Sequence, residues 1–306
     1  MKILVATEKP FAKVAVDGIR EVTEKAGYEL ALLEKYTDKN QLLSAIADAD
    51  AVIIRSDIID AEVLDAAKKL RIVVRAGAGY DNIDLNAATA HNVVAMNTPG
   101  QNSNAVAELA IGLMIYISRN QFTPGTGSEL RGKTLGIQAY GNVGRLVASH
   151  ARAFGMKIMA YDPFVPAEAM EKEGVAVAAN LEELYSSSDF VSLHIPANDQ
   201  TKGSIGYDLV CKMPKGGCLV NTARKEVIDE QGLIKAMTER EDLKYVTDIA
   251  PDTAEEMAGK FGKRFFTTPK KQGAETAEAN INAGLAAARQ ICDYFETGCT
   301  RFQLNK

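Results

Sequence analysis

Residues 134–164 carry the pattern that most restricts how this chain can fold. An apolar, β-branched run leads into the hexapeptide AYGNVG (139–144), a helical stretch follows, and a second apolar run ends in an aspartate at position 162. A strand, a glycine turn, a helix and a strand in this order are typical of a parallel sheet with an anion at the helix N-terminus, where free N–H groups and the helix dipole favour negative charge. We therefore predict a site for the pyrophosphate of a dinucleotide.

Spacing within this segment gives each key residue an expected role. Gly141 would let the backbone approach the pyrophosphate, and Gly144 would let the helix pack closely on the strand. Asp162 lies 21 residues beyond Gly141, where a carboxylate accepts a hydrogen bond from the ribose 2′-OH and repels a 2′-phosphate, so NAD is expected rather than NADP. Position 139 holds alanine where the fingerprint has its first glycine, and alanine resists a positive φ.

The whole chain alternates short apolar runs with helical patterns. The runs that predict strands are 3–6, 30–33, 51–55, 72–75, 93–96, 135–139, 157–161, 190–194, 218–221, 245–248 and 265–267. This alternation predicts the α/β class, with parallel sheets that helices cover on both faces. At roughly 150 residues per domain, a chain of 306 residues predicts two domains.

Three further segments predict helices or loops. Residues 105–117 are apolar on nearly all sides apart from Glu108, so this helix must be buried, either between domains or against a second subunit. Residues 121–132 are rich in turn formers and predict a loop. Residues 276–297 predict a long helix that Gly298 ends.

Composition and charge limit the kinds of partner and cellular location that we expect for this chain. The net charge of −5 disfavours nucleic acid and anionic membrane surfaces. No apolar run approaches the ~18 residues that span a bilayer, and charged Glu8 and Lys9 follow the N-terminal run, so we expect neither a membrane span nor a signal peptide and place the protein in the cytoplasm. The four cysteines include no CxxC pair and the three histidines lack metal-ligand spacing, so no metal site is expected.

A series of motifs recurs in a fixed order along nearly the whole chain. They are IIRSDI (53–58), VVRAGAGYDNIDL (73–85), NTPGQNSNAVAELA (97–110), the segment 134–164, SLHIP (192–196), MPKGGCLVNTARKEVID (213–229), YVTDIA (245–250) and TPKKQGAETAEAN (268–280). With these motifs the chain resembles the D-2-hydroxyacid dehydrogenase family, and within it the short D-3-phosphoglycerate dehydrogenases that lack a C-terminal regulatory domain.

The resemblance implies two doubly wound domains. Residues 1–98 and 279–306 would form a flavodoxin-like substrate domain, and residues 99–278 would form a Rossmann domain that binds NAD. The chemistry would lie in the cleft between them, and closure would expel water. Because the chain ends at residue 306, soon after the last predicted helix, we expect no regulatory domain of the serine-inhibited type.

Oxidation of a 2-hydroxy acid requires a cation that holds the carboxylate and polarises the carbonyl, and a base that takes the hydroxyl proton. Arg224 matches the family's catalytic arginine, and a planar guanidinium grips a carboxylate in bidentate fashion. Asp248 matches the family carboxylate that contacts the nicotinamide carboxamide. Other positions match residues that line the cofactor, namely Asn142, Val143, His194, Ile195, Pro196, Thr222 and Ala223.

The chain departs from the family pattern at the acid/base. The family's usual histidine follows Thr-Pro, whereas here Lys270 stands at that position, and Thr253 replaces the partner glutamate. A carboxylate beside a lysine would stabilise the ammonium and spoil the base, so both changes fit one mechanism. The resemblance implies a subgroup that uses lysine, and we expect Lys270 to take the proton. The alternatives are that Lys270 only binds substrate charge while water takes the proton, or that Lys271 or Asp252 is the base.

Substrate selection is expected to depend on the first domain. Arg55, Ser56 and Arg75 lie at or just beyond predicted strand ends, and the resemblance implies that arginines there hold a phosphate. The backbone of Gly77 and Ala78 follows a strand and would form a nest for the substrate carboxylate. Asn102 matches a family asparagine that lines the cleft.

These expectations combine into NAD-dependent oxidation of 3-phospho-D-glycerate, the first step of serine biosynthesis, by a homodimer. One alternative keeps the chemistry and changes the substrate, as in a hydroxypyruvate or glyoxylate reductase of the same family. The other is a non-catalytic NAD-binding sensor, which the missing histidine and glutamate favour.

Overall fold

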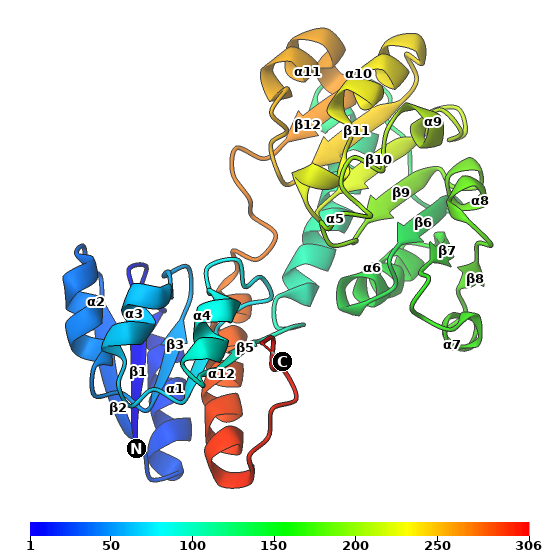
Figure 1. Cartoon of the computed structure of the whole chain (residues 1–306). Coiled ribbons are helices and arrows are strands. Elements are labelled where there is room, and N and C mark those ends of the chain that lie inside the picture. The colour runs from blue at the N-terminus through cyan, green and yellow to red at the C-terminus, as the bar shows by residue number, and fades with distance from the viewer. Residues whose placement is uncertain (306) are drawn as a thin grey trace. The chain divides into compact units, whose positions relative to one another are not determined.

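The computed structural model describes residues 1–305, which form two compact units. The first unit combines Met1–Asn102 with a C-terminal segment that begins at Glu275, and the second unit is Ser103–Ala274. Each unit is a parallel sheet with helices on both faces (Figure 1), so the expected α/β class with two doubly wound sheets is confirmed.

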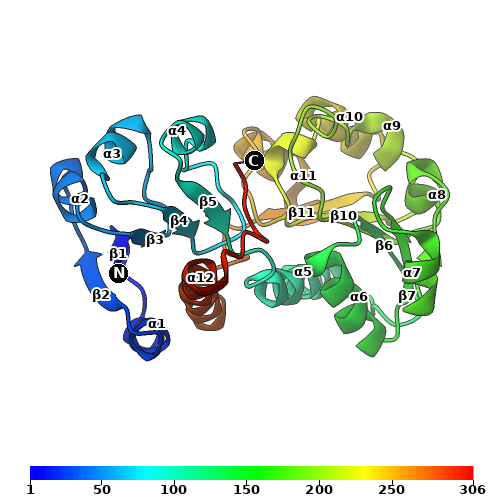
Figure 2. The same ribbon diagram turned by 60° about the horizontal axis from the view of Figure 1, so that its bottom comes forward.

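The first unit contains a five-stranded sheet of order β2-β1-β3-β4-β5. Its elements are β1 (Lys2–Thr7), α1 (Lys13–Lys25), β2 (Glu29–Glu34), α2 (Lys39–Ile46), β3 (Ala51–Ile54), α3 (Ala61–Ala66), β4 (Ile72–Arg75), α4 (Leu85–Ala90), β5 (Val94–Asn97) and α12 (Ala277–Thr297). Helices α2, α3 and α4 cover one face, and α1 and α12 cover the other (Figure 2). Neighbouring residues of β1 enter opposite cores, Ile3 on the α1 side and Leu4 on the α2 side, because a parallel sheet is buried on both faces.

The second unit contains a seven-stranded sheet of order β12-β11-β10-β9-β6-β7-β8. Its strands are β6 (Thr134–Gln138), β7 (Lys157–Tyr161), β8 (Ala176–Val177), β9 (Phe190–Leu193), β10 (Cys218–Asn221), β11 (Lys244–Thr247) and β12 (Phe265–Thr267). Its helices are α5 (Ser103–Ser118), η1 (Asn120–Phe122), α6 (Asn142–Ala153), α7 (Ala167–Lys172), α8 (Leu181–Ser186), α9 (Tyr207–Val210), η2 (Lys225–Val227), α10 (Glu230–Glu239), α11 (Ala254–Phe261) and η3 (Gly262–Arg264). The strand order reverses at β6, which pairs with β7 on one side and β9 on the other, and ligands of such sheets bind beyond the carboxyl ends at this point.

Most predicted strands agree with the observed ones to within one residue at each end. Strand β8 has no counterpart among the predicted runs, because two residues are too few for a periodic signal. The predicted loop 121–132 is wrong at its start, where η1 places three consecutive non-glycine residues at positive φ, an arrangement that propensity does not reveal. Helix α12 is confirmed: the Thr276 hydroxyl accepts from the Ala279 N–H at 3.1 Å, and Gly298 ends the helix at φ +71°.

Helix α5 is buried along one side in the second unit. Ala107, Ala110 and Met114 are fully covered, and the helix packs against α6. Gly112 is exposed, and Leu109 and Ile115 are partly buried. The apolar sequence of this helix is therefore only partly used by the contacts of its own unit.

Residues 1–305 contain neither a helix that could span a membrane nor a cluster of side chains that could hold a metal ion. No helix in this range is long and apolar enough to cross a membrane. The range also contains no group of three histidine, cysteine or acidic side chains placed to hold a metal ion.

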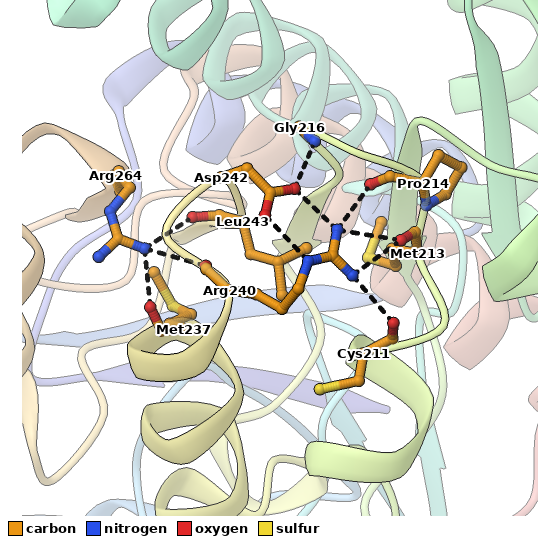
Figure 3. Close-up of polar contacts among 9 residues, drawn as sticks. All are labelled: Cys211, Met213, Pro214, Gly216, Met237, Arg240, Asp242, Leu243 and Arg264. Atoms are coloured by element: carbon orange, nitrogen blue, oxygen red, sulfur yellow. Dashed lines mark hydrogen bonds and ion pairs between the residues drawn. The ribbon is translucent and has the colours of Figure 1, made fainter.

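The amino ends of β10, β11 and β12 are tied together by a cluster around Arg240, which we call the amino-edge clamp. Arg240 donates two hydrogen bonds to the Asp242 carboxylate, at 2.9 and 2.7 Å, and Asp242 also accepts from the Gly216 N–H at 2.7 Å (Figure 3). The guanidinium bonds hold the pKa of the Asp242 carboxyl well below its usual range. Arg240 also donates to the carbonyl groups of Cys211, Met213 and Pro214, and the nearby Arg264 donates to those of Met237, Arg240 and Leu243.

Candidate functional site

The glycine turn connects β6 to α6 with the backbone that a dinucleotide fingerprint requires. Ala139 adopts φ +76°, so an alanine holds the left-handed conformation in which glycine is usually found. A Cβ on Gly144 would overlap the carbonyl oxygen of Ala139, which explains the need for glycine there. A Cβ on Gly141 would meet no atom within 4 Å, so the space above the turn is open to a ligand.

The start of α6 and the end of β7 provide groups suited to a nucleotide. Helix α6 begins at Asn142, followed by Val143, without a side-chain cap, so N–H groups of its first turn are available to an anion. Just beyond β7, Asp162 accepts from the Tyr140 N–H through Oδ2 at 2.7 Å and from the Phe164 N–H through Oδ1 at 2.8 Å. Each oxygen keeps a lone pair, so the carboxylate can still accept from a ribose hydroxyl.

The remaining residues expected to line the cofactor follow the carboxyl ends of neighbouring strands of the same sheet. His194, Ile195 and Pro196 follow β9, Thr222 and Ala223 follow β10, and Asp248 follows β11. Because parallel strands end at a common edge, these residues share an edge with the glycine turn.

His194 is a neutral residue at this edge. Its Nε2 lies 3.0 Å from Ser192 Oγ, and its backbone N–H donates to the Gln138 carbonyl at 3.0 Å. Removal from water lowers the pKa of the imidazole to about 3. Near pH 7 the ring is therefore uncharged, which argues against His194 as the acid that protonates a substrate.

Thr222 carries a hydroxyl that the chain itself does not satisfy. The side chain is buried, and its Oγ1 has no hydrogen-bond partner among the described residues. An unpaired buried hydroxyl costs about 1–3 kcal/mol, so such atoms are uncommon without a reason. The orphan hydroxyl marks a place where a ligand can complete the hydrogen bonding.

Arg224 leaves β10 through a turn that Asn221 holds in place. The Asn221 amide donates to the Arg224 carbonyl at 2.9 Å, and its Oδ1 accepts from the Ala223 N–H at 3.0 Å. The partly buried guanidinium donates to the Ala223 carbonyl at 2.9 Å, and no carboxylate in residues 1–305 forms an ion pair with it. Its charge is therefore available to a substrate carboxylate. Sequence analysis missed Asn221, although a polar residue that closes an apolar strand was a usable signal.

Lys270 lies in the irregular segment after β12, with an exposed side chain. No hydrogen bond or ion pair reaches this side chain from the described part of the chain. At the position of the family's glutamate, the Thr253 hydroxyl donates to the Glu230 carboxylate at 2.7 Å. Asp252, one of the alternative bases, forms an ion pair with Lys225 at 2.5 Å, which weakens its case as a free base.

In the first unit, Arg55 and Arg75 stand at the carboxyl ends of the paired strands β3 and β4. The Arg55 guanidinium donates to the carbonyl groups of Lys9 and Pro10, at 3.3 and 3.4 Å, and to Asn280 Oδ1 at 2.5 Å. All of these acceptors are neutral, so the positive charge of Arg55 is not compensated within the unit. Arg75 Nε donates to the Arg55 carbonyl at 3.0 Å, which joins the two residues.

The expected nest follows β4 directly. Gly77 has φ +154°, and a Cβ there would overlap Nη1 of Arg75, so the guanidinium lies against this glycine. The Gly77 N–H donates to the Arg75 carbonyl at 2.9 Å, whereas the N–H of Ala78 has no acceptor in the described part of the chain. Ser56 is exposed and Asn102 is partly exposed, and the side chains of residues 1–305 give neither one a hydrogen bond.

Asp57 supports this arginine pair and was not foreseen. Its buried carboxylate accepts from the Glu8 N–H at 2.8 Å, from the Tyr36 hydroxyl at 2.8 Å and from the Arg55 N–H at 3.1 Å. Burial raises the pKa of Tyr36, and the bond to Asp57 adds to the effect. Because two of the three donors, Glu8 and Tyr36, come from distant parts of the chain, no local pattern signals this role.

Comparison with known families gives one match. Residues 113–269 match the family described as D-isomer specific 2-hydroxyacid dehydrogenase, NAD binding domain. The matched range contains the glycine turn, Asp162, Arg224 and Asp248.

Individual proteins that resemble this chain are dehydrogenases and reductases of 2-hydroxy and 2-oxo acids by name. The chain is 54% identical to a 3-phosphoglycerate dehydrogenase of Entamoeba histolytica whose crystal structure holds the cofactor NAD+, with a TM-score of 0.87 and coverage of 100% of this chain and 99% of that one. It is 35% identical over 280 residues to the hydroxypyruvate reductase of Thermotoga maritima, covering 86% of this chain and 90% of that protein. It is 38% identical over 272 residues to the D-3-phosphoglycerate dehydrogenase of Methanocaldococcus jannaschii, covering 83% of this chain and 51% of that protein. The chain thus spans about half the length of the curated phosphoglycerate dehydrogenases it matches.

Proposed function

Because this chain belongs to the D-isomer specific 2-hydroxyacid dehydrogenase family, we propose that it oxidises 3-phospho-D-glycerate to 3-phosphohydroxypyruvate with NAD, the first step of serine biosynthesis. Similarity over the full length of the Entamoeba histolytica enzyme supports this reaction. The observation that carries the choice of a phosphorylated substrate is the uncompensated guanidinium of Arg55, joined to Arg75 at the carboxyl edge of the first unit.

The residues of the second unit fit NAD. The orphan hydroxyl of Thr222, the open space above Gly141 and the unused lone pairs of Asp162 are the three signs of this fit. The turn Gly141–Gly144 and the first turn of α6 would hold the pyrophosphate, and Asp162 would hold the ribose. Bound there, NAD would supply the acceptor for the hydride from the substrate's C2.

The chain's own residues would perform the rest of the chemistry. Arg224 would grip the substrate carboxylate and polarise the C2 oxygen as it becomes a carbonyl. Neutral Lys270 would take the C2 hydroxyl proton, so that an N–H bond forms at Nζ as the O–H bond breaks; in the reverse direction the ammonium would return it. Arg55 and Arg75 would bind the phosphate, the nest at Gly77 and Ala78 would receive the carboxylate, and Ser56 and Asn102 would complete the substrate contacts.

A substrate panel tests this proposal. NADH formation is measured with 3-phospho-D-glycerate, D-glycerate and D-lactate under the same conditions. We expect kcat/KM for the phosphorylated acid to exceed the others by about 10²-fold or more, because the smaller acids offer no phosphate to the positive charge of Arg55. Equal efficiencies would remove the proposed role of Arg55 and Arg75.

The relative from Thermotoga maritima favours one alternative, a hydroxypyruvate reductase. Reduction of hydroxypyruvate and of 3-phosphohydroxypyruvate with NADH separates the two, since only the phosphorylated acid should use the arginine pair. Absence of turnover with every acid, together with NAD binding, would instead favour a non-catalytic sensor.

We also propose that the protein is a cytoplasmic homodimer. The partly exposed apolar side of α5, which includes Leu109, Gly112 and Ile115, supports an interface with a second copy. Light scattering after size-exclusion chromatography is expected to give about twice the chain mass of 33.0 kDa. A particle of the single-chain mass would exclude the dimer.

A further inference from the structure

A buried carboxylate lies directly beneath the segment that carries Lys270. Asp248 follows β11 and is fully buried. Its Oδ1 accepts from the Gln272 N–H at 2.8 Å, and its Oδ2 accepts from the Gly273 N–H at 2.7 Å. The Thr268 hydroxyl donates to the Asp248 carbonyl at 2.7 Å and lies 3.1 Å from Oδ1, so it holds both the backbone and the side chain of Asp248.

All of these donors belong to one short stretch of chain. Residues 268–273 contain no helix or strand, so no regular backbone bonding fixes their path. Lys270 lies between the contact at Thr268 and the contacts at Gln272 and Gly273. The carboxylate therefore secures the segment two residues before and two residues after the exposed lysine.

Glycine at position 273 allows the segment to approach the Asp248 carboxylate closely. A Cβ at this position would lie 2.9 Å from Asp248 Oδ2 and 3.3 Å from Val106 Cγ2, so any larger residue would push the segment away from the carboxylate. Burial of a carboxylate is unfavourable unless hydrogen bonds replace water, and here the segment provides them. The carboxylate at this strand end thus accepts from three residues of one loop.

We propose that Asp248 is a positioning residue for the acid/base: its carboxylate anchors residues 268–273 and thereby sets the point from which Lys270 reaches the substrate hydroxyl. This role is additional to the nicotinamide contact expected from the family, and it rests on the proposed function of Lys270. Loosening the anchor should lower the fraction of time in which the amine is placed for proton transfer. It should therefore lower kcat while leaving the binding of NAD nearly unchanged.

Thr268→Val tests the anchor, because it removes one hydroxyl donor and keeps the side-chain shape and the Asp248 carboxylate. Thr267→Val is the matched control, since that hydroxyl donates to the Thr268 carbonyl at 3.2 Å and not to Asp248. We expect kcat of Thr268→Val to fall about 10-fold, with the NAD dissociation constant within about twofold of wild type, and kcat of Thr267→Val to change less than about twofold. Gly273→Ala should reproduce the Thr268→Val result.

A double-mutant cycle separates positioning from general damage. In a Lys270→Met background, Thr268→Val should lower the residual rate by less than about twofold, because the residue it positions is gone. An equal loss in both backgrounds would overturn the proposal. Hydrogen exchange gives a readout that does not need turnover: the Gln272 and Gly273 amides should exchange about 10-fold faster in Thr268→Val than in wild type.

Unchanged exchange in Thr268→Val would also overturn the anchor, whatever the enzyme oxidises. If instead the wild-type protein turns over no 2-hydroxy acid, or Lys270→Met keeps full activity, the proposed function fails. The exchange experiment then still decides whether Asp248 anchors the segment. The two failures are therefore distinguishable.

Discussion

At the amino edge of the seven-stranded sheet, the guanidinium of Arg240 is bonded to a carboxylate and to three carbonyl groups, whereas at the carboxyl edge that of Arg224 is bonded to one carbonyl group. Within the amino-edge clamp, the polar groups form hydrogen bonds with one another (Figure 3). The carboxyl edge keeps unused hydrogen-bonding capacity in the Thr222 hydroxyl, the Arg224 guanidinium and the exposed amine of Lys270.

This difference separates stability from chemistry within one sheet. A polar group that is fully bonded inside the protein contributes to folding and has nothing to offer a ligand. A group left without its full set of partners destabilises the folded chain slightly and can bind one. Substitutions of Arg240 and of Lys270 should therefore have opposite profiles, with stability affected by the first and activity by the second.

Replacement of Lys270 is the largest expected effect on activity. Lys270→Met should lower kcat at least ~10²-fold, because the general base is removed, and should change the free energy of unfolding by less than about 0.5 kcal/mol, because the side chain is exposed. Steady-state NADH formation and urea unfolding measure the two quantities.

The control for that experiment is Lys263→Met, which removes an exposed lysine at the other end of the same strand, β12. It should keep both activity and stability near the wild-type values. A loss of less than threefold in Lys270→Met would exclude Lys270 as the base.

The amino-edge clamp should show the reverse profile. Arg240→Met removes the guanidinium that donates to Asp242 and to three carbonyl groups, and it should lower the free energy of unfolding by about 2–3 kcal/mol, with kcat per folded molecule unchanged. Urea unfolding and active-site titration measure this. Lys212→Met, which removes the exposed ion pair to Glu182, should cost less than about 0.5 kcal/mol. A loss of kcat in Arg240→Met at full stability would end the contrast between the edges.

Acid should destabilise the carboxyl edge through His194. Its folded-state pKa is lowered to about 3, so between that value and the ordinary value of 6.5 the unfolded chain binds the extra proton. The contribution of His194 to stability is therefore complete above pH 6.5 and is lost as the pH falls toward 3, by up to ~1.4 kcal/mol per pH unit.

Urea unfolding between pH 7 and 4.5 tests this, with His194→Gln as the comparison. The wild-type protein should lose about 1–2 kcal/mol more than the variant over this range. Acidic groups that the two proteins share cancel in the difference. Parallel pH profiles would show that the imidazole is not held in its neutral form.

The fold and the carboxyl edge that holds the candidate site can be predicted from the sequence, because the signals for both lie in short segments. Strand runs, the glycine turn and the spacing to Asp162 are all properties of short segments, so periodicity and motif spacing reveal them. The supports of the site could not be predicted in this way. Asp57 collects donors from Glu8 and Tyr36, and Asp248 collects them from residues about 20 positions further along the chain. Such contacts depend on the packed sheet and leave no periodic signal.

The smallest expected effect concerns the glycine turn itself, where the carboxyl edge contains a strained residue. Ala139 holds φ +76°, a left-handed conformation that costs an alanine about 1–2 kcal/mol. Ala139→Gly removes this cost but makes the unfolded chain more flexible, which costs about 0.4–1 kcal/mol in the opposite direction. The variant should therefore be more stable by roughly 0.5–1 kcal/mol, with NAD binding unchanged because the backbone path is the same. Urea unfolding and a fluorescence titration with NAD measure the two quantities. A less stable variant would show that surrounding contacts compensate the free-energy cost of the left-handed alanine. The turn would then contribute no net strain to the carboxyl edge.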